Sequence, residues 1–271
     1  MNKKILAVSF EGVINHGVYE CCVVSLNAYH RISKESFFRR HMKPKEIELM
    51  KNTLVVRGFV LFRPLVSRAE DYFLVLKMIE GDVDGIYELL VSESRDKFET
   101  FLRRFEILKR ETPENILRNF HENFYRERRR LRERNPEAWL TLQKPIEENI
   151  NELRKLSKKF VIYVTTNKDK ETCLLLLRRY GVDFVKETNV LPKEDGDVKD
   201  KIGLILKREN VTPEKIFLID DIFHRDLAEI KNRGVNVFLI RGGYSFPWDV
   251  ERAEANGIGI LERGNFVNGL I

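Results

Sequence analysis

The chain has 271 residues, which is enough for one large domain or for a core domain that carries an inserted one. Hydrophobic residues make up 43 % of it, charged residues 33 %, and the formal net charge is +6. Because 48 lysines and arginines are interspersed with 42 acids, this charge permits an anionic ligand but is not typical of a dedicated nucleic-acid-binding protein. The many charges and the single glutamine, Gln143, are typical of thermophilic proteins.

The cysteines and the apolar segments limit the class of protein further. Cys21, Cys22 and Cys173 give no disulfide framework, because their number is odd and adjacent cysteines rarely pair. No spacing of histidines and cysteines indicates a zinc site. The N-terminus lacks the apolar region of a signal peptide, and no run of about 18 apolar residues occurs. We therefore expect a cytoplasmic protein that does not cross a membrane.

The first predicted element is a buried strand over residues 4–11. Apolar residues then recur at helical spacing through most of residues 16–154. Residues 51–66 are an exception, because this apolar and β-branched stretch predicts a short strand or an extended loop. Farther on, Thr112 and Pro113 predict a helix start, with the threonine as N-cap and the proline at the first helical position.

From about residue 151 predicted strands alternate with predicted helices. The strands cover residues 160–167, 215–221 and 235–243, with a short strand within 182–191 and an apolar segment at 257–264. The helices between them cover residues 169–181, 197–210 and 225–234. This alternation predicts an α/β fold with a parallel sheet and right-handed crossovers. The first strand belongs to the same sheet, so the helical stretch is an insertion after it.

Polar residues follow the predicted strands at their carboxyl ends, where open parallel sheets bind ligands. They are Ser9 and Glu11 before Gly12, Thr166 and Asn167, Lys199 and Lys201 at a helix start, and Asp220, Asp221 and Asp226. Each also has a purely structural interpretation, since threonine and asparagine cap helices and lysines near helix starts usually face solvent. Their occurrence at successive strand ends, in order, favours one shared site.

This ordered set resembles the haloacid dehalogenase superfamily. Its pattern is an Asp-x-Asp-Gly loop after the first strand, Thr/Ser-Asn after the second, a lysine near a helix start and an acidic loop after a later strand. The resemblance covers residues 1–15 and about 155–271. It implies a Rossmann-like parallel sheet, the haloacid dehalogenase-like core, formed by those residues. Residues 16–154 then match the mainly helical cap that the family inserts between its first and second motifs.

The resemblance also implies roles for the site residues. In that family the first aspartate attacks a phosphoryl group, and the second protonates the leaving oxygen and later activates water. Ser9 stands at the first of these positions and Glu11 at the second. Thr166 and Asn167, with Lys201 or alternatively Lys199, match the groups that hold phosphoryl oxygens. The expected ligands of Mg²⁺ are Asp221, Asp220 and Asp226.

Ser9 is the main departure from the family pattern. A neutral serine contributes no charge to the metal, so we expect weakened Mg²⁺ binding. We therefore expect a protein related to magnesium-dependent phosphohydrolases that binds a phosphorylated small ligand, with impaired or absent phosphatase activity. One alternative is an active phosphohydrolase with atypical chemistry at Ser9 and Glu11. Another is an interaction or nucleic-acid-binding protein that uses the fold as a scaffold.

The insertion contains six arginines within residues 126–134. Such a run can follow phosphates, or it can form a solvated helix face with pairs such as Glu127 and Arg130. The aromatic residues of the insertion recur at helical spacing and predict a packed core. His16 and His224 lie beside the predicted site edge in the sequence. Neither the substrate nor the oligomeric state can be inferred from these patterns.

Overall fold

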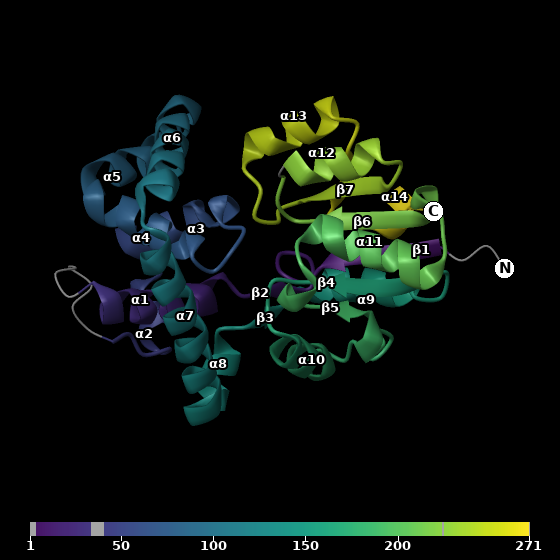
Figure 1. Ribbon diagram of the computed structural model, residues 1–271, viewed down its shortest axis with the longest axis horizontal. Coiled ribbons are helices and arrows are strands. Elements are labelled where there is room, and N and C mark those ends of the chain that lie inside the picture. The colour runs from purple at the N-terminus through teal and green to yellow at the C-terminus, as the bar shows by residue number, and fades with distance from the viewer. Residues whose placement is uncertain (1–3, 34–40, 224, 271) are drawn as a thin grey trace. The chain divides into compact units, whose positions relative to one another are not determined.

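The computed structural model describes residues 4–33, 41–223 and 225–270. The chain divides into two compact units (Figure 1). Unit 1 comprises Met1–His16 and Pro145–Ile271, and unit 2 comprises Gly17–Lys144. The chain leaves unit 1 after β2 (Asn15–His16) and returns through β3 (Lys144–Pro145), and these two short strands pair with each other.

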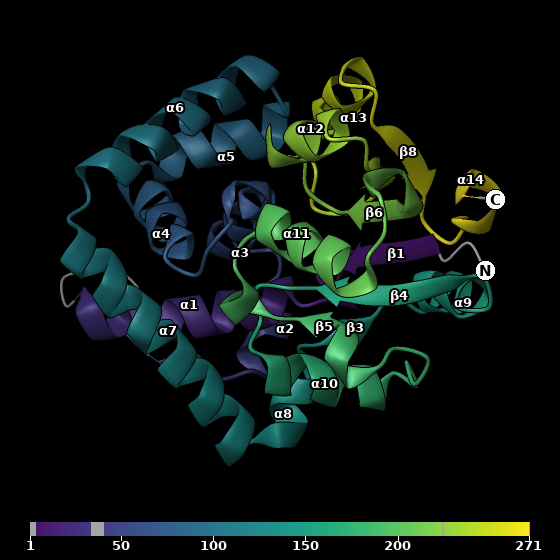
Figure 2. The ribbon, with the colours of Figure 1, turned by 45° about the vertical axis from the view of Figure 1, so that its right-hand side comes forward.

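Unit 1 contains a six-stranded sheet in the order β5-β4-β1-β6-β7-β8. The strands are β1 (Lys4–Ser9), β4 (Phe160–Thr165), β5 (Val190–Leu191), β6 (Ile216–Asp220), β7 (Asn236–Arg241) and β8 (Gly259–Glu262). All five strand pairs run parallel, and Figure 2 shows β1 beside β4 within the sheet. This topology confirms the predicted α/β fold with a Rossmann-like parallel sheet.

The helices of unit 1 follow the strands in chain order. They are α9 (Glu147–Leu156), α10 (Lys170–Arg179), α11 (Val198–Glu209), α12 (Arg225–Asn232), α13 (Pro247–Ala255) and α14 (Val267–Leu270). Apolar residues of α11, α12 and α13 join one core cluster with alternate residues of β1, Ile5 and Ala7. Their neighbours Leu6 and Val8 are also fully buried. Burial of both sets of side chains means that β1 is covered on both faces, as expected for a central parallel strand.

The regular elements of unit 2 in its described residues are helices, apart from Lys144 of β3. Its helices are α1 (Val18–Ile32), α2 (Glu46–Met50), α3 (Leu54–Leu61), the 3₁₀ turn η1 (Arg63–Leu65), α4 (Asp71–Gly81), α5 (Val83–Ser92), α6 (Arg95–Glu111), α7 (Glu114–Arg134) and α8 (Pro136–Thr141). Aromatic side chains form much of its core, as predicted. Phe62 stacks on Phe98, and Tyr72 packs against Phe124. No helix in the described part of the chain is long and apolar enough to cross a membrane.

Two local predictions in the insertion are wrong. Residues 51–66 form α3 and η1 rather than a strand or an extended loop. Val56 and Phe59, three residues apart, are both fully buried, so core packing of this helical face outweighs the β propensity of the segment. Helix α7 starts at Glu114 with Pro113 as N-cap, whereas Thr112 is the C-cap of α6. Thr112 has extended backbone angles, which the following proline favours.

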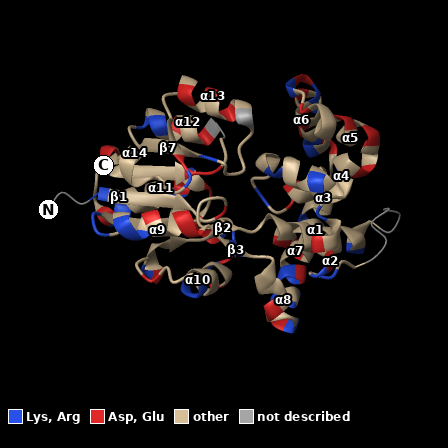
Figure 3. Ribbon diagram, turned by 180° about the vertical axis from the view of Figure 1, so that it is seen from behind, with Lys and Arg blue, Asp and Glu red and all other residues tan. Residues whose placement is uncertain are grey.

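The arginine run of α7 is partly internal. Arg128 is buried and donates from Nε and Nη2 to the carboxylate of Glu20, at 2.7 and 2.9 Å, and Glu20 is itself fully buried. Arg126, Arg129 and Arg134 are exposed. Figure 3 shows that both basic and acidic residues lie on the helices. The run therefore combines an exposed helix face with an ion pair that holds α7 to α1.

Candidate functional site

The predicted site residues of unit 1 lie at the carboxyl edge of its parallel sheet. Ser9 ends β1, Thr166 directly follows β4, and Asp220 ends β6. In the strand register Ser9 is opposite Thr165, and Val8 is opposite Ile219. The ends of the three strands are therefore level, which brings together residues that are more than 150 positions apart in the sequence.

Ser9 and Asp221 are hydrogen-bonded to each other at this edge. Ser9 Oγ donates to Asp221 Oδ1 over 3.1 Å, and Asp221 is 2 % exposed. A Cβ atom built on Gly12, which has φ of +73°, would lie 2.4 Å from Asp221 Cβ, and one on Gly243 would lie 2.8 Å from it. Both contacts are too short for any residue but glycine. The Asp221 side chain is thus held between the loop after β1 and the loop after β7.

Lys201, in the first turn of α11, belongs to the same edge. It is 2 % exposed, and Nζ donates to the backbone oxygen of Thr166 at 2.8 Å and to Asn167 Oδ1 at 3.2 Å. Burial lowers the pKa of Lys201 to about 8, and nearby carboxylates, Asp195 first, counteract part of this effect. A capping box at Asp197 and Asp200 fixes where α11 begins and hence where Lys201 lies.

The sequence left Lys199 and Lys201 as alternatives, and the structure separates them. Lys199 Nζ lies 3.1 Å from Asp226 and 3.2 Å from Glu229, both on α12. The hydrogen bonds to these two carboxylates, Asp226 first, and their charges raise the pKa of Lys199. Lys201 therefore joins the edge that contains Thr166 and Asn167, whereas Lys199 links the surfaces of two helices.

Glu11 has a buried cationic partner that the sequence analysis did not identify. Lys168 Nζ lies 2.9 Å from Glu11 Oε1, and Lys168 is 3 % exposed. Asn15 Nδ2 donates to the same oxygen at 3.1 Å, and Tyr180 donates its hydroxyl to Asn15 Oδ1 at 2.7 Å. Burial, followed by the charge of Glu11, raises the pKa of Tyr180. The carboxylate at the second position of the first loop is thus fixed in a polar network.

The three predicted metal ligands do not form a cluster. Asp220 Oδ1 accepts from the backbone N–H of Asp221 at 2.7 Å and of Ile222 at 3.4 Å, so it stabilises the turn after β6. Asp226, on α12, pairs with Lys199 of α11. Across residues 4–33, 41–223 and 225–270, no three carboxylate, histidine or cysteine side chains come together as a metal site. The structure therefore places Asp220 and Asp221 at the edge and directs Asp226 to a surface pair.

A loop after β7 contributes groups without any sequence signal. Tyr244 is 7 % exposed, and its hydroxyl lies 2.9 Å from His16 Nδ1, with the two rings stacked. Ser245 Oγ donates to the backbone oxygen of Asp221 at 2.8 Å. His16, expected beside the site, is thus packed against Tyr244. His224, named with it, lies outside the described residues.

Solved structures with a similar fold cover nearly the whole chain. A candidate phosphoglycolate phosphatase from Lactobacillus delbrueckii subsp. bulgaricus matches with a TM-score of 0.61 at 13 % identity, over 97 % of this chain and 96 % of that one. A candidate phosphatase from Clostridium difficile matches with 0.57 at 14 % identity over the full length of both chains. A haloacid dehalogenase-like family hydrolase from Streptococcus pneumoniae matches with 0.51 at 13 % identity, over 96 % and 94 %.

The chain has the haloacid dehalogenase-like fold. No protein-family profile matches its sequence, and no curated protein matches it either. The resemblance found in the sequence is therefore confirmed at the level of the fold. The loop after β1 has the sequence Ser9-Phe10-Glu11-Gly12. The hydroxyl group of Ser9 donates to Asp221.

Proposed function

We propose that this haloacid dehalogenase-like chain binds a phosphorylated small molecule at the carboxyl edge of its sheet, with impaired or absent phosphatase activity. The observation that supports this most is the hydrogen bond from Ser9 Oγ to Asp221, at 3.1 Å. A hydroxyl that donates to a carboxylate still carries its proton and is a poor nucleophile until a base removes it. Ser9 thus occupies the nucleophile position of the family with a much less reactive group.

The same substitution favours binding of an anion. A carboxylate at position 9 would place a further negative charge beside Asp221, and serine removes it, which reduces repulsion of a phosphate dianion. Lys201 offers three N–H donors, of which Thr166 and Asn167 occupy two in the described structure. The third is a donor for a phosphoryl oxygen at the same edge, as the family resemblance implies. Serine at position 9 therefore accounts both for the loss of the nucleophile and for the proposed gain in anion affinity.

Magnesium fits this edge only in part. Asp221 and Asp220 would be its carboxylate ligands here, and the ion would supply charge neutralisation for the phosphoryl oxygens. The described residues gather no third acidic ligand, and Asp226 is engaged by Lys199. We therefore expect weak Mg²⁺ binding and assign it no step. Phosphate binding then depends on Lys201, Thr166 and Asn167.

The helical insertion is proposed to serve as a cap that selects the substrate. Residues 16–154 correspond in the sequence to the family's cap between its first and second motifs. The compact helical unit Gly17–Lys144 supports this assignment, because it folds around its own aromatic core. The parallel-sheet core of residues 1–15 and 155–271 then carries the phosphate site.

An active phosphohydrolase that uses Ser9 with Glu11 as its base is less well supported. Glu11 Oε1 interacts with Lys168 and Asn15, whereas the carboxylate that receives the Ser9 hydroxyl belongs to Asp221. A nucleic-acid-binding scaffold is also less well supported, because 42 acids nearly balance the 48 bases of the chain and both kinds lie on the helices (Figure 3). A steep decrease of RNA affinity with salt would favour that scaffold.

The experiment that tests the proposal compares the wild type with Ser9→Asp. Hydrolysis of 4-nitrophenyl phosphate with magnesium and calorimetric binding of inorganic phosphate are measured for both. We expect a wild type that binds phosphate without turnover, and a Ser9→Asp variant that gains turnover. Ser9→Ala is the matched control, because it removes the hydroxyl without adding a charge. Wild-type turnover that Glu11→Gln abolishes would instead establish atypical catalysis, and absence of phosphate binding would refute the proposal.

A further inference from the structure

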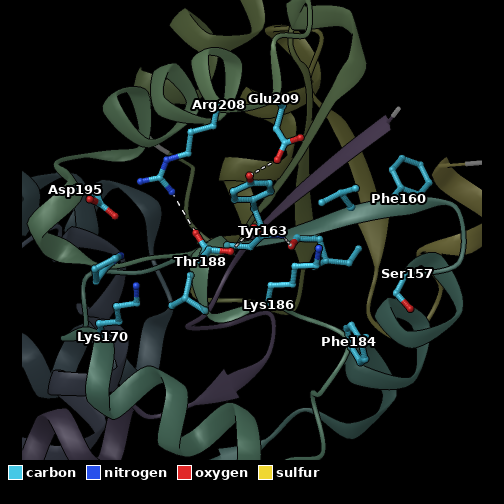
Figure 4. A pocket seen from close by; sticks show the side chains of 15 residues that line it. Ser157, Phe160, Tyr163, Lys170, Phe184, Lys186, Thr188, Asp195, Arg208 and Glu209 are labelled. Carbon is cyan, nitrogen blue, oxygen red and sulfur yellow. Dashed lines mark hydrogen bonds between the residues drawn. The ribbon is translucent and has the colours of Figure 1, made fainter. Parts of the chain in front are cut away.

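Unit 1 contains a pocket of about 890 Å³ along β4, shown in Figure 4 around Tyr163. It exists because β5 is short and pairs only with Val164 and Thr165 of β4. Neither Ser9 nor Lys201 is among its lining residues. A more direct contact for a ligand at the phosphate edge is a pair of stacked rings next to Asp221.

The two rings belong to His16 and Tyr244. Their centroids lie 5.3 Å apart at an interplanar angle of 17°, so the rings are stacked. The hydroxyl oxygen of Tyr244 is also 2.9 Å from His16 Nδ1. Tyr244 is 7 % exposed, whereas His16 is only partly buried. The tyrosine is thus a buried support, and the histidine is a partly accessible surface whose orientation its neighbour fixes.

The tyrosine lies beside Asp221 because of the residues on both sides of it in the sequence. Gly243 approaches Asp221 so closely that a Cβ atom on the glycine would lie 2.8 Å from Asp221 Cβ. Ser245 Oγ donates to the backbone oxygen of Asp221 at 2.8 Å. Tyr244 is covalently joined to both of these residues, so its backbone lies against the turn that contains Asp221.

The histidine is connected to the same aspartate by a second route. A Cβ atom on Gly12 would lie 2.4 Å from Asp221 Cβ. The backbone N–H of Gly12 donates to the backbone oxygen of Asn15 at 2.8 Å, and His16 is the next residue. The loop after β1 and the loop after β7, which both contact Asp221, thus carry the two rings. The ring pair therefore borders the edge at which Ser9 Oγ donates to Asp221.

We propose that the phosphorylated ligand of this edge carries a flat aromatic ring, which stacks on the imidazole of His16. This inference rests on the proposed function, because the phosphate group determines which end of the ligand lies at Ser9 and Lys201. Aromatic rings attract each other in offset-stacked arrangements beyond the effect of their buried area. The contact with Tyr244 holds the imidazole in one orientation before the ligand binds, which lowers the entropic cost of stacking. The ligand class is therefore that of aromatic phosphate monoesters, and His16 distinguishes them from aliphatic ones.

The probes for this inference are benzylphosphonate and cyclohexylmethylphosphonate. Both carry the same anionic group on rings of similar size, and neither has a phosphate ester bond to hydrolyse. Titration calorimetry measures the binding of both probes and of inorganic phosphate. We expect the wild type to bind the aromatic probe at least about threefold more tightly than the aliphatic one. His16→Ala should abolish this preference and leave the affinity for inorganic phosphate within about twofold of the wild type.

Two further variants separate stacking from a loss of folding. His16→Phe retains a flat ring and should retain the preference for the aromatic probe. His121→Ala is the matched control, because His121 also has a tyrosine ring beside it, Tyr125 at 4.8 Å, but lies on α7 of unit 2. That variant should bind both probes as the wild type does.

The outcomes separate this inference from the proposed function. Equal affinity of the wild type for the two probes would overturn the inference, and so would an aromatic preference that persists in His16→Ala or is lost in His16→Phe. Each of these results leaves the proposed function intact if inorganic phosphate binds. A wild type that binds neither inorganic phosphate nor either phosphonate would refute the proposed function, and the inference with it.

Discussion

Lys168 Nζ and Glu11 Oε1 form an ion pair of 2.9 Å in which the lysine is almost completely buried. This pair connects the loop after β1 to the loop after β4. Asn15 also contacts the carboxylate, so Glu11 is held by a charge and by an amide at once. The second position of the first loop is therefore a structural link between two loops of the edge.

Removal of Lys168 should destabilise the protein strongly. Lys168→Met leaves the Glu11 carboxylate without its cation in a mostly buried position, which costs about 3 kcal/mol. Glu11→Gln should cost a similar amount, because it leaves the almost completely buried ammonium group of Lys168 without its counter-charge. The double variant should lose less than the sum of the single variants, since both act on one interaction. Urea unfolding of the four proteins measures the coupling, and strict additivity would show that the two residues do not stabilise each other.

The pH dependence of phosphate affinity should follow Lys201. Its pKa is lowered from 10.5 to about 8, so the ammonium group loses its proton within an accessible pH range. Affinity for inorganic phosphate should therefore fall about tenfold between pH 8 and pH 9.5. Lys201→Arg retains its charge and should show a much smaller fall. Titration calorimetry measures phosphate affinity of both proteins across this pH range. An equal fall in affinity for the wild type and Lys201→Arg would contradict the role of the Lys201 ammonium group in phosphate binding.

The same pKa shift predicts the direction of a stability change. The folded state holds this proton less tightly than the unfolded chain, so the unfolded chain binds more protons between pH 8 and 10.5. The contribution of Lys201 to the free energy of unfolding therefore increases as pH rises through this window. Lys201→Met should remove that contribution, and the difference between variant and wild-type unfolding curves measures it. The stability of the wild type relative to Lys201→Met should therefore rise with pH, and a fall would contradict the direction.

Gly12→Ala should disturb Asp221 directly. The added Cβ would lie 2.4 Å from Asp221 Cβ, and the backbone φ of +73° is unfavourable for alanine. We expect a loss of about 2 kcal/mol in unfolding free energy and weaker phosphate binding. Gly203→Ala in α11 is the matched control, because nothing lies within 4 Å of its added Cβ. That change should stabilise the protein by about 0.5–1 kcal/mol, and equal destabilisation by both variants would refute the argument.

The buried pair of Arg128 and Glu20 should support unit 2. Arg128→Met leaves a fully buried carboxylate without its partner and should cost about 3–5 kcal/mol. Its neighbour Arg129 is exposed, so Arg129→Met should change stability by less than about 0.5 kcal/mol. Thermal unfolding of the two variants gives the comparison. Similar melting temperatures would mean that the buried pair contributes little.

The sequence predicted which residues lie at the carboxyl edge of the sheet better than it predicted the side-chain contacts among them. Ser9, Thr166 and Asp221 could be placed together because parallel strands end at one edge, which depends on topology rather than on side-chain detail. The choice of Lys201 over Lys199 could not be made, because it depends on which face of α11 packs inward. Lys168 directly follows Thr166 and Asn167 in the sequence, but its burial and its pairing with Glu11 are properties of the packed state.

Other features had no sequence signal that reasoning could use. Tyr244 reaches His16 from a loop that matches no pattern, and its contact exists only after β7 is placed in the sheet. The helix α3 was missed because its β-branched residues favour a strand locally and packing overrides them. The pocket beside β4 follows from the two-residue length of β5, and strand ends are the least certain part of any prediction from sequence.

The pairing of β2 with β3 has a consequence for how the chain is assembled. The polypeptide leaves the sheet unit at His16 and re-enters it at Pro145, and these two points are neighbours in one small sheet. All six strands of the large sheet are encoded outside residues 17–144. With respect to the large sheet, the helical segment is thus an insertion that contributes no strand. A short turn joining His16 to Pro145 would keep every strand neighbour in place, and insertions or exchanges of whole helical modules can occur there without altering the order of the sheet.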